Sequence, residues 1–154
     1  MKQAAWFFAG DEEPFLLHNV DVVSRIDLGR MVEAHRERGA LATLAVQERV
    51  TSRRLLFDQD GWLCGRRKGD VEAEMVRAAE VATPLAFCGI HVLSPKLPGM
   101  LVEEGVFSII DAYLRLAGRG ERIGAFRADA YYWRDLGKPE QIEAAERDRE
   151  RGLW

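Results

Sequence analysis

The sequence contains little sulfur and no long apolar run. No apolar stretch reaches the roughly 18 residues that a membrane-spanning helix needs, and Ala4–Ala9 is too short to resemble a signal peptide. The two cysteines, Cys64 and Cys88, have no metal-ligand spacing and lie in apolar, strand-like surroundings, which favours buried free thiols. These absences argue against a zinc site and predict a cytoplasmic protein without a membrane partner.

The sequence also lacks an excess of positive charge and a nucleotide-binding glycine motif. Its formal net charge is −3, so it offers no overall basic character for binding nucleic acid. No Gly-x-Gly-x-x-Gly follows a strand, which excludes a dinucleotide-binding oxidoreductase. A chain of 154 residues that is 47% apolar can bury one substantial core, so residues 1–154 are expected to form a single α/β domain.

A strand, a helix and a second strand follow one another near the start of the chain. Phe15–Val20 has the pattern of a short buried strand, and Ala40–Gln47 has that of another. Between them lies an amphipathic helix with Asp27 as its N-cap and Gly39 as its C-terminal stop. This order is typical of a βαβ unit, so we expect parallel neighbouring strands and a mostly parallel sheet.

The middle of the chain predicts a β-hairpin insertion. Arg54–Asp58 and Trp62–Gly65 are two short apolar runs around Asp60-Gly61, a strong hairpin signal. Five basic residues accompany this hairpin, and a solvated strand pair is the favoured interpretation over contact with phosphate. They are Arg53, Arg54, Arg66, Arg67 and Lys68.

Two aspartates lie at the ends of extended segments. Asp21 follows the strand Phe15–Val20, and Asp135 follows the aromatic run that ends at Trp133. Open α/β sheets bind ligands outside the carboxyl ends of their strands, and paired carboxylates suit Mg²⁺. We therefore predict that Asp21 and Asp135 share a Mg²⁺ site. The alternative for each is a cap, of the following turn for Asp21 and of the helix near Pro139 for Asp135.

Asn19 and Gly89 are the candidate substrate-binding residues. Strand alternation places Asn19 on the same face as Asp21, where it could orient a substrate hydroxyl or satisfy loop backbone. Gly89 follows a buried strand segment, where it could admit a sugar close to the backbone or form a simple bulge. The sequence does not separate these alternatives.

Five segments, taken in order, resemble the sugar-1-phosphate nucleotidylyltransferases, also called NDP-sugar pyrophosphorylases. They are Phe15-Leu-Leu-His-Asn-Val-Asp21, Ala40-Leu-Ala-Thr-Leu-Ala-Val46, Phe87-Cys-Gly-Ile-His-Val92, Phe107-Ser-Ile-Ile-Asp111 and Trp133-Arg-Asp-Leu-Gly-Lys-Pro-Glu140. The resemblance implies a partial nucleotidyltransferase fold, Rossmann-like and mostly parallel. It also implies transfer of a nucleoside monophosphate from a nucleoside triphosphate to a sugar 1-phosphate, with Mg²⁺ held by catalytic Asp21 and Asp135.

The sequence departs from this family at three places. The family's Gly-Gly-x-Gly-Thr/Ser-Arg signature is absent, so the resemblance covers only the later part of the enzyme. Cys64-Gly-Arg-Arg-Lys-Gly69 replaces the family's Glu-Lys-Pro stretch, and Lys138 replaces its usual threonine. We expect the sheet edge at Phe15–Val20 to be open and to be covered in a homo-oligomer or by a companion chain. The alternative function is a non-catalytic fragment that binds a sugar phosphate or regulates a partner polypeptide.

Overall fold

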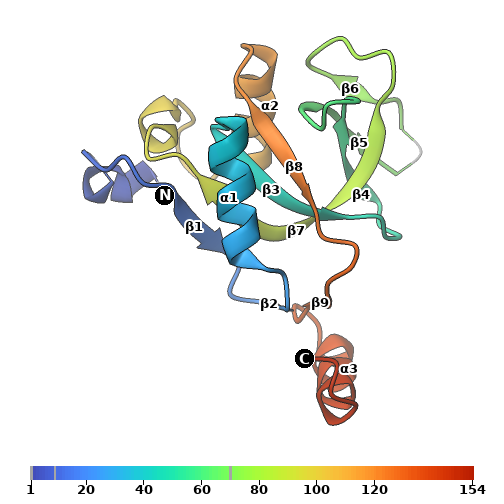
Figure 1. The fold of residues 1–154 in the computed structure, drawn as a ribbon. Helices are drawn as coiled ribbons and strands as arrows, with labels where there is room; N and C mark the ends of the chain where they lie inside the picture. Colours follow the sequence, from blue (N-terminus) through green and yellow to red (C-terminus); the bar gives the residue numbers. More distant parts are fainter. Residues whose placement is uncertain (1, 9, 70) are drawn as a thin grey trace.

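The computed structural model describes residues 2–8, 10–69 and 71–154 (Figure 1). The three α-helices of these ranges are α1 (Leu28–Arg38), α2 (Ile109–Gly118) and α3 (Pro139–Glu150), and the two 3₁₀ helices are η1 (Lys2–Phe7) and η2 (Leu97–Met100). The strands are β1 (Phe15–His18), β2 (Val22–Ser24), β3 (Ala42–Gln47), β4 (Arg53–Phe57), β5 (Leu63–Lys68), β6 (Glu74–Met75), β7 (Thr83–Leu93), β8 (Ile123–Arg127) and β9 (Trp133–Asp135). No helix in the described ranges has the length and apolarity to cross a bilayer.

The main sheet is mixed, so the prediction of a mostly parallel sheet is wrong. Its strands lie in the order β6-β5-β4-β7-β3-β8, with β1 pairing on β7 as well. Of these pairings only β3 with β8 is parallel, and the others are antiparallel. A separate two-stranded sheet is formed by β2 and β9. The α/β class is confirmed, and the parallel character is confined to one strand pair.

The βαβ interpretation fails because a later strand separates the two strands of the unit. β1 pairs antiparallel with β7 on one edge, and β3 pairs antiparallel with β7 on the other. β1 and β3 therefore run in the same direction on either side of β7, with α1 between them in the chain. The spacing of strand, helix and strand predicts their direction correctly and gives no information about what lies between them.

The hairpin is present and continues the main sheet. In its turn Gly61 has a positive φ of 76°, and the Asp58 side chain accepts a hydrogen bond from the Trp62 backbone N–H at 2.8 Å. Asp58 and Trp62 also close the ladder through a backbone hydrogen bond of 2.9 Å. β4 then pairs with the start of β7, so the hairpin extends the sheet on the side where β1 also joins it.

Two apolar clusters form the core, one on each face of the sheet. One cluster includes Met31 of α1 with Ile90 and Val92 of β7, and the other includes Tyr113 of α2 with Leu93. Successive residues of β7 thus alternate between the two faces, as strand geometry requires. The result is a three-layer arrangement with α1 in front of the sheet and α2 behind it in Figure 1.

The Phe15–Val20 segment is shorter as a strand than the sequence predicts. β1 ends at His18, and Val20 and Asp21 form a turn before β2. Side-chain alternation along one strand therefore does not relate Asn19 to Asp21. The edge of β1 that faces away from β7 has no partner strand among the described residues. Leu16 in this strand is 44% exposed. The homo-oligomer or companion chain that would cover this edge stays a prediction, which sedimentation equilibrium can test.

His91 and Tyr113 form a buried polar pair beneath α2. The His91 Nδ1 atom and the Tyr113 hydroxyl are 2.8 Å apart, and both side chains are almost fully buried. Burial, with a smaller contribution from His18, lowers the pKa of His91 to about 3. His91 is therefore a neutral structural residue that joins β7 to α2 by a hydrogen bond.

Removing the Tyr113 hydroxyl should destabilise the fold. In Tyr113→Phe the neutral His91 ring loses its partner, and we expect the unfolding free energy to fall by about 1–3 kcal/mol. Tyr131→Phe is the matched control, because the half-buried Tyr131 hydroxyl makes no hydrogen bond among the described residues. Urea unfolding of both variants measures the difference. Equal unfolding free energies of the two variants would show that the hydrogen bond between His91 and Tyr113 does not stabilise the fold.

The same burial makes stability depend on pH. The unfolded His91 takes up a proton near its ordinary pKa of about 6.5, whereas the folded ring stays neutral down to about 3. Burial also lowers the pKa of His35, which acts in the same direction. The unfolding free energy should therefore fall from pH 7 to pH 5, by up to about 1.4 kcal/mol per pH unit for each histidine. An NMR titration that finds the His91 ring protonating near pH 6.5 would contradict this account.

Candidate functional site

The small sheet of β2 and β9 brings the two predicted metal ligands together. Val22 is paired with Asp135, and the Leu136 backbone N–H donates to the Asp21 carbonyl at 2.7 Å. The two carboxylates approach one point, the position that a Cβ atom on Gly137 would occupy: Asp135 Oδ1 lies 3.1 Å from it and Asp21 Oδ2 3.7 Å. The absence of a side chain at Gly137 thus leaves room between the carboxylates of two residues that are far apart in the sequence.

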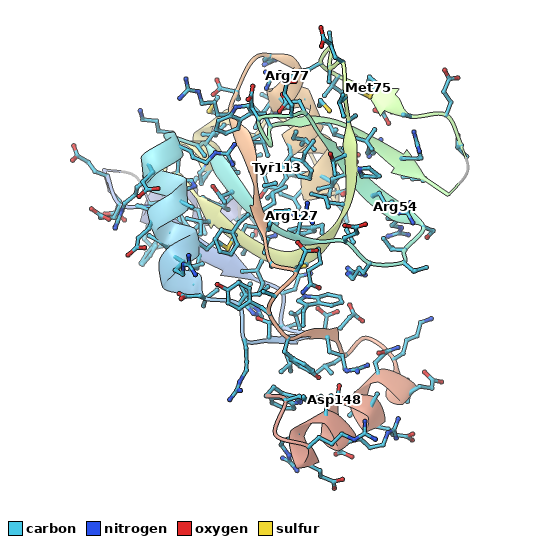
Figure 2. All side chains as sticks on the ribbon, turned by 45° about the vertical axis from the view of Figure 1, so that its right-hand side comes forward. Arg54, Met75, Arg77, Tyr113, Arg127 and Asp148 are labelled. Carbon is cyan, nitrogen blue, oxygen red and sulfur yellow. The ribbon has the colours of Figure 1, made fainter. Side chains whose placement is uncertain are left out.

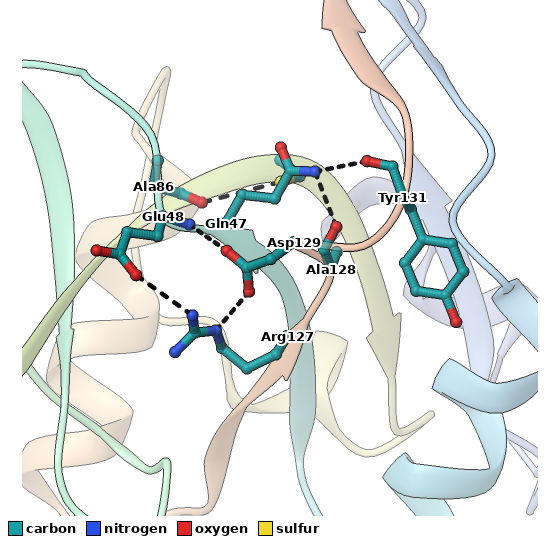
Figure 3. Close-up of polar contacts among 8 residues, drawn as sticks. Gln47, Glu48, Ala86, Arg127, Ala128, Asp129 and Tyr131 are labelled. Carbon is teal, nitrogen blue, oxygen red and sulfur yellow. Dashed lines mark hydrogen bonds and ion pairs between the residues drawn. The ribbon is translucent and has the colours of Figure 1, made fainter. Parts of the chain in front are cut away.

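A polar network holds the chain segment that leads into β9 (Figure 3). The Gln47 side-chain amide donates to the Ala128 carbonyl at 2.8 Å and to the Tyr131 carbonyl at 2.9 Å. Asp129 accepts from the Glu48 backbone N–H, and one of its oxygens also binds Arg127 at 2.6 Å. These bonds fasten the turn after β8 to the end of β3, so the chain reverses and returns Asp135 towards β2.

Trp133 and Arg49 fasten β9 to the middle of β7. The indole N–H of Trp133 donates to the Cys88 carbonyl at 2.7 Å. The Arg49 guanidinium lies over the indole ring, 4.0 Å from its centroid, and donates to the Phe87 carbonyl at 2.8 Å. The Arg49 Nε is buried and has no hydrogen-bond partner among the described residues. The fixed indole therefore sets the position of Asp135, two residues further along the chain.

Asn19 and Gly89, the two predicted substrate-binding residues, contact each other. The Asn19 backbone N–H donates to the Gly89 carbonyl at 2.9 Å, and a Cβ atom on Gly89 would lie 2.9 Å from Asn19 Nδ2. Gly89 has a positive φ of 74° and lies where the pairing of β7 with β3 shifts register, so it does form a bulge. The space that the glycine leaves open is filled by the side chain of Asn19.

A cleft of about 990 Å³ opens beside these residues. Asn19, Gly89 and Asp135 line it, and Asp21 lies next to Asp135 without itself lining the cleft. Trp133 forms part of the wall, and the hairpin β4–β5 forms another part, with its basic side chains. The hairpin cations, which the sequence favours as a solvated strand pair, thus line the same cleft as the predicted site.

The donor set at Asp21 and Asp135 fits Mg²⁺. Both residues are exposed, and the Asp21 carboxylate makes no hydrogen bond or ion pair among the described residues. Asp135 Oδ1 accepts from the Gly137 backbone N–H at 3.0 Å. Of the described residues, no three His, Cys, Asp or Glu side chains are grouped to hold a metal. Mg²⁺ commonly binds through one or two carboxylates together with water and substrate phosphates, so two carboxylates suffice.

The two thiols, of which Cys88 lines the cleft, are not candidate nucleophiles. Burial raises the pKa of Cys88 to about 12, so the thiol stays protonated near neutral pH. Cys64 is also buried, and burial raises its pKa as well. The prediction of two buried free thiols is confirmed.

Three residues that shape the site have no role assigned to them from the sequence. Arg49 carries no motif, and only the fold shows that its guanidinium covers Trp133. Trp133 lies two residues before Asp135, which is a usable signal, because an aromatic residue beside a candidate ligand often forms the wall of a site. Gln47 is likewise visible only in the structure.

The contact between Gly89 and Asn19 predicts the effect of a substitution. Gly89→Ala should lower the unfolding free energy by about 1–3 kcal/mol, since alanine is strained at a positive φ and its Cβ meets Asn19. Asn19→Ala in the same chain should restore part of this loss by removing Nδ2 and Cγ. Gly99→Ala is the control, because nothing lies within 4 Å of a Cβ there, and we expect a change within about 0.5 kcal/mol. Urea unfolding compares the variants, and a neutral Gly89→Ala would refute the contact.

The fold of this chain is similar to that of solved sugar-1-phosphate nucleotidylyltransferases. No protein-family model and no curated protein matches the sequence. A protein from Bacillus anthracis named as a glucose-1-phosphate thymidylyltransferase, in complex with sucrose, has a TM-score of 0.69 at 15% identity over 95% of this chain and 57% of its own. UDP-glucose pyrophosphorylase from Acinetobacter baumanii has a TM-score of 0.69 at 20% identity over 94% of this chain and 52% of its own.

HddC from Yersinia pseudotuberculosis has a TM-score of 0.64 at 17% identity, over 94% of this chain and 58% of its own. The chain therefore spans little more than half the length of each of these proteins. At these identities the likeness concerns the fold. Over nearly all of its length, this chain has the α/β fold of one part of these nucleotidyltransferases.

Proposed function

We propose that this chain forms the sugar-phosphate-binding and Mg²⁺-binding part of a nucleotidyltransferase. The reaction transfers a nucleoside monophosphate from a nucleoside triphosphate to a sugar 1-phosphate and gives an NDP-sugar and pyrophosphate. The observation that carries the proposal is the meeting of Asp21 and Asp135 beside a cation-lined cleft. The likeness of the fold to glucose-1-phosphate thymidylyltransferase and UDP-glucose pyrophosphorylase supports it.

Each part of the site has a task in this reaction. Asp21 and Asp135 hold Mg²⁺, which when bound offsets the repulsion between two phosphate groups that must approach each other. Lys138, the N-cap residue of α3 and three residues after Asp135, lines the cleft and offers its ammonium group to a phosphate. The Asn19 side chain lies at the cleft wall, where its amide can orient a sugar hydroxyl. Gly89 contributes by making room for Asn19.

The anchor of α3 keeps Lys138 in place. Arg134 binds Asp148 of α3 through Nη2 at 2.5 Å and Nε at 2.9 Å, and Tyr132 donates to the same carboxylate at 2.9 Å. Figure 2 shows Asp148 on α3, which stands apart from the sheet. Since α3 begins at Pro139, this clamp also positions the residue before it.

A second candidate function is a non-catalytic module that binds a sugar phosphate or regulates a partner polypeptide. One observation favours it: the 154 residues contain no glycine-rich phosphate-binding motif. The two functions share the same cleft and differ in whether pyrophosphate is released.

Asparagine substitutions test the metal ligands. In Asp21→Asn or Asp135→Asn one of two carboxylates is lost, so the affinity for Mg²⁺ in the presence of glucose 1-phosphate should fall by roughly tenfold or more. Asp11→Asn removes the same charge from an exposed residue that does not line the cleft, and it should bind as the wild type does. Isothermal titration calorimetry measures each affinity. Unchanged Mg²⁺ binding in either site variant would remove that residue from the proposal.

The release of pyrophosphate separates the two functions. The chain is incubated with Mg²⁺, glucose 1-phosphate and each common nucleoside triphosphate in turn. Pyrophosphate that depends on Asp21 and Asp135 supports the enzyme. Binding of Mg²⁺ and glucose 1-phosphate without pyrophosphate from any triphosphate supports the binding module.

A further inference from the structure

The charge of the cleft is the reverse of that of the whole chain. The protein has 25 acidic and 22 basic residues, whereas the cleft is lined by eight arginine and lysine side chains and only two aspartates, Asp111 and Asp135. The cations come from different parts of the chain: the loop after β3, the hairpin β4–β5, and the segment from β9 to α3. Such a concentration of one sign in a concave surface raises the local concentration of anions.

Most of these cations have no carboxylate partner. Arg66 is paired with Glu74 and Asp111, and Arg134 is paired with Asp148. The other six make no ion pair with any described residue, and their charge is left for a ligand or solvent. These six are Arg49, Arg53, Arg54, Arg67, Lys68 and Lys138.

The hairpin places like charges directly opposite one another. Arg53 is the cross-strand partner of Lys68, and Arg54 is the partner of Arg67. Like charges at opposed positions destabilise an antiparallel pair, and no carboxylate of the described residues forms an ion pair with either of these two pairs. On the next position of the same strand, by contrast, Arg66 is flanked by two carboxylates. Arg66 also lines the cleft, so the unpaired charge of the hairpin lies at its far end, at the two opposed pairs.

The cations are divided between two walls. Lys138 lies near Asp135, at the wall where the metal and the 1-phosphate are proposed to bind. The hairpin forms a different wall, and Figure 2 shows Arg54 on β4, well separated from α3 in this view. A single phosphate held beside Asp135 would pair with Lys138, the unpaired cation on the same wall of the cleft. Of the four unpaired cations of the hairpin, Arg54 and Arg67 are cross-strand partners, so they lie on the same face of the strand pair and can contact one group together.

We propose that the substrate of this cleft is a sugar 1-phosphate with a second anionic group, a carboxylate or a second phosphate. This inference rests on the proposed function, since it assigns the 1-phosphate to the wall of Asp135. Arg54 and Arg67 bind the second anion, and guanidinium groups offer the paired N–H donors that carboxylate and phosphate both accept. The second anion relieves the repulsion between the opposed hairpin cations.

A set of defined ligands tests the proposal in the presence of Mg²⁺. Calorimetry compares glucose 1-phosphate with glucuronic acid 1-phosphate and glucose 1,6-bisphosphate, which add a carboxylate and a phosphate respectively. At least one of the two doubly anionic sugars should bind at least about tenfold more tightly than glucose 1-phosphate, and the stronger of them identifies the second group. Equal affinity for all three would overturn this inference and leave the proposed function standing. Failure of all three to bind would overturn the proposed function itself.

Variants of the hairpin show which residues carry the preference. Arg54→Gln with Arg67→Gln should remove most of the advantage of the doubly anionic sugar. Arg30→Gln with Arg119→Gln is the matched control, because it removes two exposed cations that do not line the cleft. It should keep the advantage. Tripolyphosphate is the competing probe: if it binds more tightly than any sugar phosphate and depends on Arg54 and Arg67, the hairpin holds a triphosphate and the inference is wrong.

Discussion

The pairing of β2 with β9 is the contact on which the site depends. These two three-residue strands join a segment near the start of the chain to one near its end. Their register pairs Asp135 with Val22, the residue after Asp21, and so brings the two aspartates close together. So short a ladder is not stable by itself, because two strands of this length bury too little surface. Its stability must come from the groups that fasten each strand to the main sheet. Val22 and Trp133 supply such contacts, since both pack against the apolar cluster beneath α1.

The fastening of β9 is polar, and this has a consequence for the cleft. Gln47 and Trp133 satisfy backbone carbonyls of the returning segment and of β7. Arg49 completes this arrangement while one of its own N–H groups remains buried without a partner among the described residues. An unsatisfied buried donor costs about 1–3 kcal/mol, a cost that the packing around it must offset. These contacts hold the side chains around the cleft in fixed positions. A site with fixed side chains loses less conformational entropy when it binds a ligand.

The sequence predicts the local elements well because each depends on nearby residues. Asp27 and Gly39 cap α1 as expected, and Asp60-Gly61 turns the hairpin, since caps and turns are set by a few adjacent positions. The order of strands in the sheet is not local. β7 lies between β1 and β3 because of contacts that no spacing in the sequence encodes, and the expected parallel sheet fails for this reason.

The site shows the same division. The type and strand-end position of Asp21 and Asp135 predict a shared ligand from sequence alone. The turn at Val20 and Asp21 and the contact between Asn19 and Gly89 are visible only in the structure. The basic hairpin is the instructive case. Its sequence is typical of a solvated strand pair, and only its place in the cleft makes the unpaired charges of Arg54 and Arg67 significant.

Two sets of like charges, the two aspartates at the edge of the cleft and the hairpin cations that line it, constrain what can bind there. The carboxylates of Asp21 and Asp135 repel each other, and so do the hairpin cations, so each set alone opposes the fold. A divalent cation and an anionic ligand, bound together, would neutralise both sets. Such binding acts only on the folded state, and at a hundredfold excess over its dissociation constant it would add about 2.7 kcal/mol to the unfolding free energy. The proposed binding of a metal ion and a phosphate would therefore act on both repulsions, which have the same electrostatic origin.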